Sequence, residues 1–369
     1  MRLLAVGHSY VSPFAQAKYA ALKRQGVSLR LVVPPVAPHL FMPFPAERHP
    51  DLTAQEHVVL PAHFAGRVAT WLPSPRRLAR LVAAFEPDII HVEEDPHSAC
   101  GLLLALLARG PGRRAALSWF TWDNLDRRPP FPLDLVKRGM QRFGFGRARL
   151  VVCGNRAGQG LLAAKGYGGP SVVLPQVGLV AADHAGPPGI DHRARLPAGP
   201  LVGFVGRLVA EKGVEDLAAA MQGLPGRLVT VGAGPLAGAL AAAGALVQPP
   251  VPHAGVADWL KALDIFVLPS RTTARWAEQF GLTLAQAMLC GLACVGSDSG
   301  AIPEVLGDAG VIVPEGDVPA LRAVLERLIA DPAERARLGA AARARALAQF
   351  TDEAVAAGYR RAFAQALAA

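Results

Sequence analysis

Two cations, Arg207 and Lys212, stand five residues apart in the segment Phe204–Gly213, which reads FVGRLVAEKG. An apolar run ends at Gly206 and a helical pattern begins after Gly213, so both cations are predicted on a loop at the carboxyl end of a buried strand. Arginine can donate two hydrogen bonds to phosphate oxygens, and lysine adds a mobile charge beside a helix N-terminus. The pattern indicates an anion site, and an ordinary basic turn is the alternative.

An acidic residue precedes a glycine turn in the segment 276–291, which reads WAEQFGLTLAQAMLCG. Glu278 stands ahead of Phe280 and Gly281, after which a helical pattern runs to about Met288. A carboxylate at this place can accept hydrogen bonds from sugar hydroxyls. The alternative is a carboxylate that caps the helix start, where negative charge is favoured in any case.

The start of this predicted helix also offers hydrogen-bond donors. The first N–H groups of a helix have no partners inside it, so they can hold a diphosphate. Here they belong to Gly281, Leu282 and Thr283. Gln286 follows about one turn further along, with one side facing the expected ligand cleft.

Short apolar runs alternate with helix-like stretches in both halves of the chain, which predicts βαβ units and parallel sheets. Strands are expected at 2–7, 28–33, 88–92, 115–119, 149–153, 200–205, 228–232, 264–268, 292–296 and 310–313. Helices are expected at 13–25, 76–85, 98–109, 132–143, 213–222, 235–243 and 350–367.

The chain is therefore expected to be an α/β protein with two Rossmann-like domains facing across a cleft. Its predicted parts are a first domain at 1–178, a Gly- and Pro-rich linker at 179–199, a second domain at 200–349 and a C-terminal helix at 350–369 that packs back on the first domain. Open parallel sheets bind ligands beyond the carboxyl ends of their strands. This fold predicts a cleft enzyme but does not specify its chemistry.

Positive charge is concentrated in the first half of the chain. The 369 residues carry a net charge of +9, and residues 1–180 hold 22 Lys and Arg against 11 Asp and Glu, whereas residues 181–369 hold 16 against 18. This asymmetry indicates an anionic partner for the first half, such as a membrane surface, a lipid phosphate or nucleic acid, or else arginines scattered on solvated faces. A nucleic-acid module would add interleaved aromatic residues or a known motif. Neither is present, so no specific nucleic-acid binding is expected.

The longest apolar run, at 99–108, is about half the roughly 20 residues that a membrane-spanning helix needs. The N-terminus lacks a signal-peptide pattern, so we expect a cytoplasmic protein that can bind peripherally at the inner membrane face. Four cysteines lie in apolar surroundings without a zinc pattern and are expected to be buried thiols. They are Cys100, Cys153, Cys290 and Cys294.

Taken together, these motifs resemble the retaining, GT-B-fold glycosyltransferases of family 4, also called group 1. Besides the two segments above, the matching stretches are TVGAGP at 230–235, ALDIFVLPS at 262–270, 290–297 and GAIPE at 300–304. The first half resembles the family through two segments, DIIHVEED at 88–95 and the segment at 151–156.

The resemblance implies roles for the residues that match its motifs. Arg207 and Lys212 would bind the diphosphate, and Glu278 would contact hydroxyls of the donor sugar. Gln286 stands where the family has a Glu that holds the ribose diol, and a neutral acceptor makes a weaker hydrogen bond than a charged one. The donor-binding residues expected on this basis are Gly206, Arg207, Lys212, Glu278, Phe280, Gly281, Leu282, Thr283 and Gln286.

In the first domain, the predicted acceptor domain, three loops after strands are expected at one edge of the sheet. His8, Glu93 and Asp123 are the acceptor-side candidates there, and Glu93 is also a catalytic candidate beside Arg207, Lys212 and Glu278. His91 lies within a strand and is interpreted as a core histidine.

The predicted reaction moves a hexose from a nucleotide diphosphate sugar to a polysaccharide or lipid-linked acceptor. The resemblance implies retention of anomeric configuration and no metal or other cofactor, which fits the lack of an Asp-x-Asp element. A GT-B-fold sugar-nucleotide epimerase, one alternative, would lack the two motifs around Arg207 and Glu278. A catalytically weakened nucleotide-sugar-binding partner is a second alternative, supported by Gln286, and a nucleic-acid-binding protein is a third, supported by charge alone.

Overall fold

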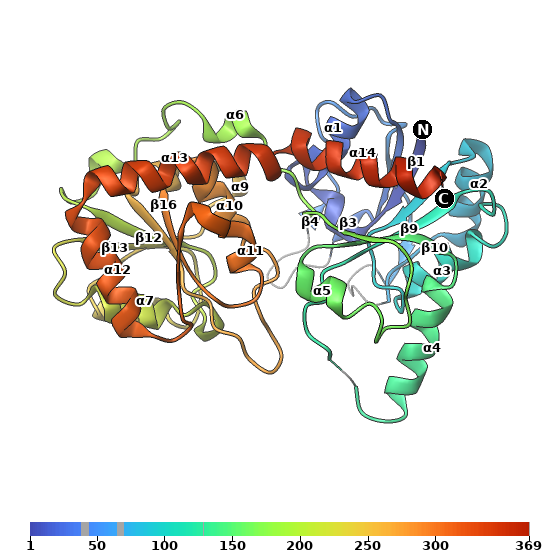
Figure 1. The fold of residues 1–369 in the computed structure, drawn as a ribbon. Coiled ribbons are helices and arrows are strands. Elements are labelled where there is room, and N and C mark those ends of the chain that lie inside the picture. The colour runs from blue at the N-terminus through green and yellow to red at the C-terminus, as the bar shows by residue number, and fades with distance from the viewer. Residues whose placement is uncertain (38–43, 65–69, 128, 369) are drawn as a thin grey trace. The chain divides into compact units, whose positions relative to one another are not determined.

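The structure, a computed structural model, describes residues 1–37, 44–64, 70–127 and 129–368. The chain divides into two compact units (Figure 1). Unit 1 consists of Met1–Leu179 together with Asp352–Ala369, and unit 2 is Val180–Thr351. Each unit is built around one parallel sheet with helices packed against it, so the predicted pair of Rossmann-like α/β domains is confirmed.

Unit 1 contains a seven-stranded parallel sheet in the order β11-β10-β9-β8-β1-β2-β5. Its strands are β1 (Arg2–Val6), β2 (Ser28–Val33), β5 (His57–Val59), β8 (Ile89–Val92), β9 (Ala116–Thr121), β10 (Ala148–Cys153) and β11 (Ser171–Val173). Its helices are α1 (Pro13–Arg24), α2 (Pro75–Phe85), α3 (Ala99–Leu107), α4 (Leu133–Phe145), α5 (Arg156–Gly160) and α14 (Asp352–Ala368). The central strands are apolar and buried on both faces, as parallel strands covered by helices must be.

Helix α14 belongs to unit 1 although it ends the chain, which confirms the expected packing of the C-terminal helix on the first domain. Its Tyr359 and Phe363 are fully buried in the same core cluster as Leu3 of β1 and Leu31 of β2. Six apolar side chains of α14 enter this cluster, so the helix forms one wall of the unit 1 core.

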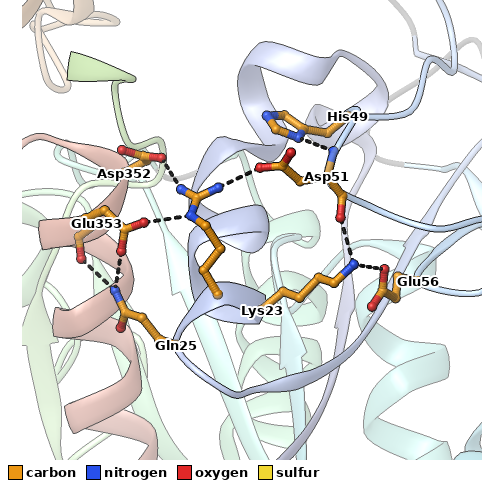
Figure 2. A network of polar contacts seen from close by, with 8 residues as sticks. Lys23, Gln25, His49, Asp51, Glu56, Asp352 and Glu353 are labelled. Carbon is orange, nitrogen blue, oxygen red and sulfur yellow. Dashed lines mark hydrogen bonds and ion pairs between the residues drawn. The ribbon is translucent and has the colours of Figure 1, made fainter. Parts of the chain in front are cut away.

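A polar network fixes the first turn of α14 to the end of α1 (Figure 2). Arg24 pairs with both Asp352 and Glu353, at 2.7 Å in each case, and Gln25 donates to a carboxylate oxygen of Glu353 at 2.8 Å. The same guanidinium reaches Asp51, so one cation joins three carboxylates. Acidic residues at the start of α14 also suit the positive end of its helix dipole.

Unit 2 contains a six-stranded parallel sheet in the order β14-β13-β12-β15-β16-β17. Its strands are β12 (Leu201–Val205), β13 (Arg227–Val231), β14 (Leu246–Gln248), β15 (Ile265–Leu268), β16 (Ala293–Ser297) and β17 (Val311–Val313). Its helices are α6 (Ala181–His184), α7 (Val214–Met221), α8 (Ala237–Ala242), α9 (His253–Lys261), α10 (Leu282–Leu289), α11 (Ile302–Leu306), α12 (Val318–Ala330) and α13 (Pro332–Gln349).

Residues 180–199, most of the expected linker, are packed on unit 2. Arg193 forms an ion pair with Asp264 at 2.7 Å, and the ring of His192 stacks on Trp259 with centroids 3.8 Å apart. The segment therefore belongs to the surface of unit 2 and includes the short helix α6.

Both sheets reverse their strand order once. In unit 1 the reversal lies between β1 and β8, and in unit 2 between β12 and β15. Loops that leave two such strands diverge to opposite sides and leave room for a ligand at the carboxyl edge. The loops after these four strands are therefore the places to look for function.

No helix in the described part of the chain is long and apolar enough to cross a bilayer. Three of the four cysteines are buried as expected, whereas Cys290 at the end of α10 is only half-buried. All four are free thiols.

Candidate functional site

The loop after β12 carries Arg207 and Lys212 and is fixed by backbone contacts with the turn between β13 and α8. The N–H of Leu208 donates to the carbonyl of Ala233 at 2.9 Å. A Cβ on Gly234 would lie 2.2 Å from the Leu208 carbonyl oxygen, so only glycine permits this approach. Arg207 projects outward with 43% of its side chain exposed and pairs with Glu211 at 3.3 Å.

The structure brings Lys212 and Glu278 together, although they are 66 residues apart in the chain. Lys212 Nζ lies 2.6 Å from Glu278 Oε2, and the hydroxyl of Ser270 donates to the same oxygen at 3.0 Å. Lys212 also lies over the ring of Trp276, 4.7 Å from its centroid. Because β12 and β15 are neighbours, the loops that follow them meet at the strand-order reversal of the sheet.

Two glycines let three loops approach one another at this point. Gly213 has φ +64°, and a Cβ there would lie 1.9 Å from the Pro269 carbonyl oxygen. Gly300 has φ +55°, and its Cβ would lie 2.1 Å from the carbonyl oxygen of Glu278. These close approaches hold the backbone on either side of the Lys212–Glu278 pair, which orients both side chains.

Helix α10 begins directly after this acidic loop. Its N-cap is Gly281, with φ +81° and no side-chain cap, and the first intrahelical bond runs from the Ala285 N–H to the Gly281 carbonyl at 3.1 Å. The N–H groups of Leu282 and Thr283 therefore precede the hydrogen-bonded series and point out of the positive end of the helix. Phe280 lies edge-on to Phe350 at 5.5 Å, so its ring has a packing contact inside unit 2.

Gln286 is buried inside α10, with 1% of its surface exposed. Its amide oxygen Oε1 has no hydrogen-bond partner among the residues that the structure describes. A buried oxygen of this kind carries a desolvation cost unless a ligand supplies a donor.

Three side chains at this site were not identified from the sequence. Ser270 orients Glu278 through its hydroxyl. It lies in the segment ALDIFVLPS, but the sequence motif alone did not predict this contact. Arg271 donates two hydrogen bonds to the carboxylate of Asp216 in α7, at 2.6 and 2.5 Å, in a bidentate pair. This bidentate pair connects the loop after β15 with α7, the helix that follows the Lys212 loop. The two residues are 55 positions apart, so no local sequence signal marks the pair.

The structure places Glu93 inside the core of unit 1. Its side chain is fully buried and forms an ion pair with Lys18, also fully buried. Its oxygens further accept hydrogen bonds from Tyr19 at 2.7 Å and Gln176 at 3.0 Å, and His91 lies 3.3 Å away. These contacts give Glu93 a structural role in unit 1, and its roles in catalysis and at the acceptor stay predictions. The interpretation of His91 as a core histidine is confirmed.

His8, the second acceptor-side candidate, lies in the loop after β1 and is hydrogen-bonded to Glu94, the residue that follows Glu93. Both its backbone N–H and its ring Nδ1 contact Glu94 Oε1, at 2.6 and 2.7 Å. Burial lowers the pKa of His8, but the hydrogen bond and charge of Glu94 outweigh it, and the pKa is raised above its ordinary value. The pair lies at the strand-order reversal of the unit 1 sheet, between the loops after β1 and β8.

Asp123, the third candidate, lies after β9 and forms ion pairs with Lys165 and Arg127, each at 3.1 Å. It lines a hollow in unit 1 together with residues of α4. Across the described ranges, no group of three His, Cys, Asp or Glu side chains is arranged to hold a metal ion.

Two protein-family models match the chain. Residues 11–178 match the glycosyl transferase 4-like domain, and residues 199–331 match glycosyl transferases group 1. The chain is 34% identical to a D-inositol 3-phosphate glycosyltransferase of Xylanimonas cellulosilytica over 50% of this chain and 49% of that protein. It is 32% identical to a GDP-mannose-dependent monoacylated alpha-(1-6)-phosphatidylinositol monomannoside mannosyltransferase of Corynebacterium glutamicum, over 42% of this chain and 44% of that protein. The matches thus span about half the length of these curated relatives.

Solved structures agree on the architecture. Sucrose-phosphate synthase of Thermosynechococcus elongatus superimposes with a TM-score of 0.73 at 20% identity, covering 100% of this chain and 99% of that one. Anabaena HepE in complex with UDP gives 0.72 at 18% identity, covering 99% and 100%. Two parallel-sheet units with this match define a protein of the GT-B class. With both family models matched over most of its length, the chain belongs to the group 1 glycosyltransferases of the family 4 type.

Proposed function

We propose that this protein transfers a hexose from a nucleotide diphosphate sugar to a lipid-linked or polysaccharide acceptor, with retention of configuration and without a metal ion. The observation that carries the proposal is the contact between Lys212 and Glu278 at the strand-order reversal of unit 2, with Arg207 on the same loop as Lys212. Cations, a carboxylate and free helix N–H groups are the chemistry that a sugar diphosphate requires. HepE, a structural neighbour, has been solved with UDP-glucose, and two relatives carry inositol or phosphatidylinositol in their names.

The proposed division of work follows from the geometry of the loops. Arg207 and Lys212 neutralise charge that develops on the departing diphosphate, together with the N–H groups at the start of α10. Glu278, held by Ser270 and Lys212, accepts hydrogen bonds from the sugar hydroxyls. The acceptor hydroxyl attacks the anomeric carbon on the face from which the diphosphate leaves, and a phosphate oxygen takes its proton. The protein thus supplies position and charge rather than a nucleophile.

Nucleotide binding is expected to raise the melting temperature of the full chain. A ligand that binds only the folded state adds about 2.7 kcal/mol of stability at a concentration about a hundred times its Kd. The measurement is a thermal-shift panel of UDP, GDP, ADP and their hexose conjugates, each with and without EDTA. Stabilisation by one diphosphate series that survives EDTA supports the proposal and identifies the base, whereas no shift with any member contradicts it.

Gln286 is expected to contribute to donor affinity through its unpartnered amide oxygen. Gln286→Ala should raise the donor KM by roughly two- to tenfold, the equivalent of one neutral hydrogen bond of about 0.5–1.5 kcal/mol. Gln286→Glu should keep or lower the KM, because a charged acceptor binds hydroxyls more strongly. An unchanged donor KM in Gln286→Ala would remove this residue from the site.

A second function is a nucleotide-sugar-binding partner without turnover, favoured by the neutral residue at position 286. It predicts the same thermal shifts. The two functions differ in product, so release of free nucleotide diphosphate in the presence of lipid extracts and glycans separates transfer from binding alone.

A further inference from the structure

Exposed apolar side chains gather on α4 and on the residues just before it. Of the nine large apolar residues exposed in the described part of unit 1, five lie within residues 131–143. They are Phe131, Leu133, Leu135, Val136 and Phe143, and their exposed fractions range from 37% at Phe143 to 85% at Phe131. Single exposed apolar residues are ordinary on a monomer, but such a concentration marks an interaction surface.

The second half of α4 is anchored in the core of unit 1. Phe145 lies against Trp119 and Tyr167, with ring centroids 6.0 and 5.4 Å away, and Gly144 approaches Pro96 closely. The first two turns are mostly exposed, and Figure 1 shows them extending away from the sheet of unit 1.

The apolar residues of α4 form a stripe. Leu133, Val136, Met140 and Phe143 follow one another at intervals of three, four and three residues, which places them on one face of a helix. Leu135 and Phe131 extend this surface at its outer end.

Basic residues border the stripe. Residues 127–149 contain seven Lys and Arg but only one acidic residue, Asp134. On the helix itself, Arg138 pairs with Asp134 at 2.6 Å, and Arg142 is exposed. The guanidinium of Arg109 from the end of α3 lies over the ring of Phe143 at 4.0 Å, which adds a further cation at the edge of the stripe.

We propose that this surface, formed by Phe131, the α4 stripe and its basic border, docks on an anionic lipid bilayer. A bilayer offers both chemistries at once, an apolar interior for the stripe and phosphates for the long basic side chains beside it. A second copy of the chain would bring the same excess of positive charge to the contact and repel it. Duplex nucleic acid would attract the cations but give the aliphatic stripe no partner.

The inference goes beyond the proposed transfer reaction, because docking needs neither Arg207 nor any donor. It supplies a physical reason for the positive charge of the first half of the sequence, which the donor site does not use.

The test is co-sedimentation of the full-length protein with vesicles, either pure phosphatidylcholine or phosphatidylcholine and phosphatidylglycerol in equal parts. We expect binding to the mixed vesicles only, weakened by salt. Leu133→Ser with Val136→Ser removes the centre of the stripe, and Lys137→Gln with Arg138→Gln and Arg142→Gln removes three charges. At about fivefold per basic residue near the surface, the triple variant should bind roughly 150-fold more weakly.

Matched controls lie elsewhere on the surface. Ile312→Ser with Leu347→Ser changes two exposed apolar residues of unit 2, and Arg360→Gln with Arg361→Gln changes two exposed cations of α14. Both controls should bind like the unaltered protein, and all variants should keep its thermal shift with nucleotide. Equal vesicle binding by the α4 variants and the controls would overturn the proposal. So would a concentration-dependent dimer that Leu133→Ser with Val136→Ser abolishes, because a second copy would then occupy the surface.

Discussion

Lys212→Ala is expected to lower kcat by roughly 10²- to 10³-fold, the effect of removing one group that stabilises developing negative charge. Its ammonium lies 2.6 Å from Glu278, and its side chain is the less exposed of the two cations in the proposed donor site. Arg207→Ala should lower kcat similarly while leaving stability almost unchanged, since its side chain is 43% exposed and its pair with Glu211 is worth only about 0.3–0.5 kcal/mol.

The two variants need separate controls. Lys212→Ala leaves the buried carboxylate of Glu278 with one partner fewer, so its melting temperature and circular dichroism should be measured alongside kcat. Arg337→Ala changes an arginine that is 71% exposed in unit 2 and far in sequence from the loops of the site. If Arg207→Ala and Lys212→Ala turn over donor as fast as Arg337→Ala, the assignment of the diphosphate site is wrong.

Lys18→Met is expected to lower the free energy of unfolding by about 3–5 kcal/mol at neutral pH, the usual cost of removing one partner of a buried ion pair. Lys18 and Glu93 are both fully buried and paired, and the lysine also lies against four aromatic rings, the nearest being Tyr359 at 4.2 Å. Removing the cation leaves Glu93 as an uncompensated carboxylate in the core.

The double variant Lys18→Met with Glu93→Gln separates charge from packing. It removes both charges, and Gln keeps hydrogen-bonding atoms for Tyr19 and Gln176, so it should recover most of the lost stability. Urea unfolding of the three proteins measures the cycle. A double variant no more stable than Lys18→Met would show that the pair acts through shape rather than charge.

The same pair predicts a loss of stability in acid. Burial alone would raise the pKa of Glu93, but the charge of Lys18 and the hydrogen bonds from His91 and Lys18 hold that pKa far below its ordinary range. A carboxyl whose pKa is lower in the folded state stabilises above its unfolded pKa, about 4.3, and this contribution is lost as the pH falls below that value. In the double variant this part of the acid dependence should vanish.

Much of the fold was predictable because the central strands of both sheets are continuous apolar runs. The segments DIIHV and DIFVL, for example, became β8 and β15 within about a residue at each end. The edge strands β5, β11 and β14 were missed because each has only three residues, two of them apolar, which is too short a run to show a strand period. Their pairing depends on a neighbouring strand rather than on a local pattern.

The contact at the centre of the proposed donor site was more predictable than the surroundings of the acceptor-side candidates, for a physical reason. Arg207, Lys212 and Glu278 lie in loops whose glycines and strand ends carry a local signal, and the order of the sheet then brings Lys212 to Glu278. Glu93 follows a strand in the same way, but its environment depends on Lys18, 75 residues earlier, and on Gln176. No local pattern reveals that a charge will be neutralised by a distant partner.

Helix α14 has a consequence for the order in which this protein is made. Unit 1 is translated first, but the wall of its core that contains Tyr359 and Phe363 is translated last, after all of Val180–Thr351. At about 5–20 residues per second, the ribosome needs roughly 10–30 s to make that intervening stretch. During this time the nascent unit 1 lacks the side chains that cover the Lys18 cluster, so unit 2 can complete its fold before the unit that precedes it.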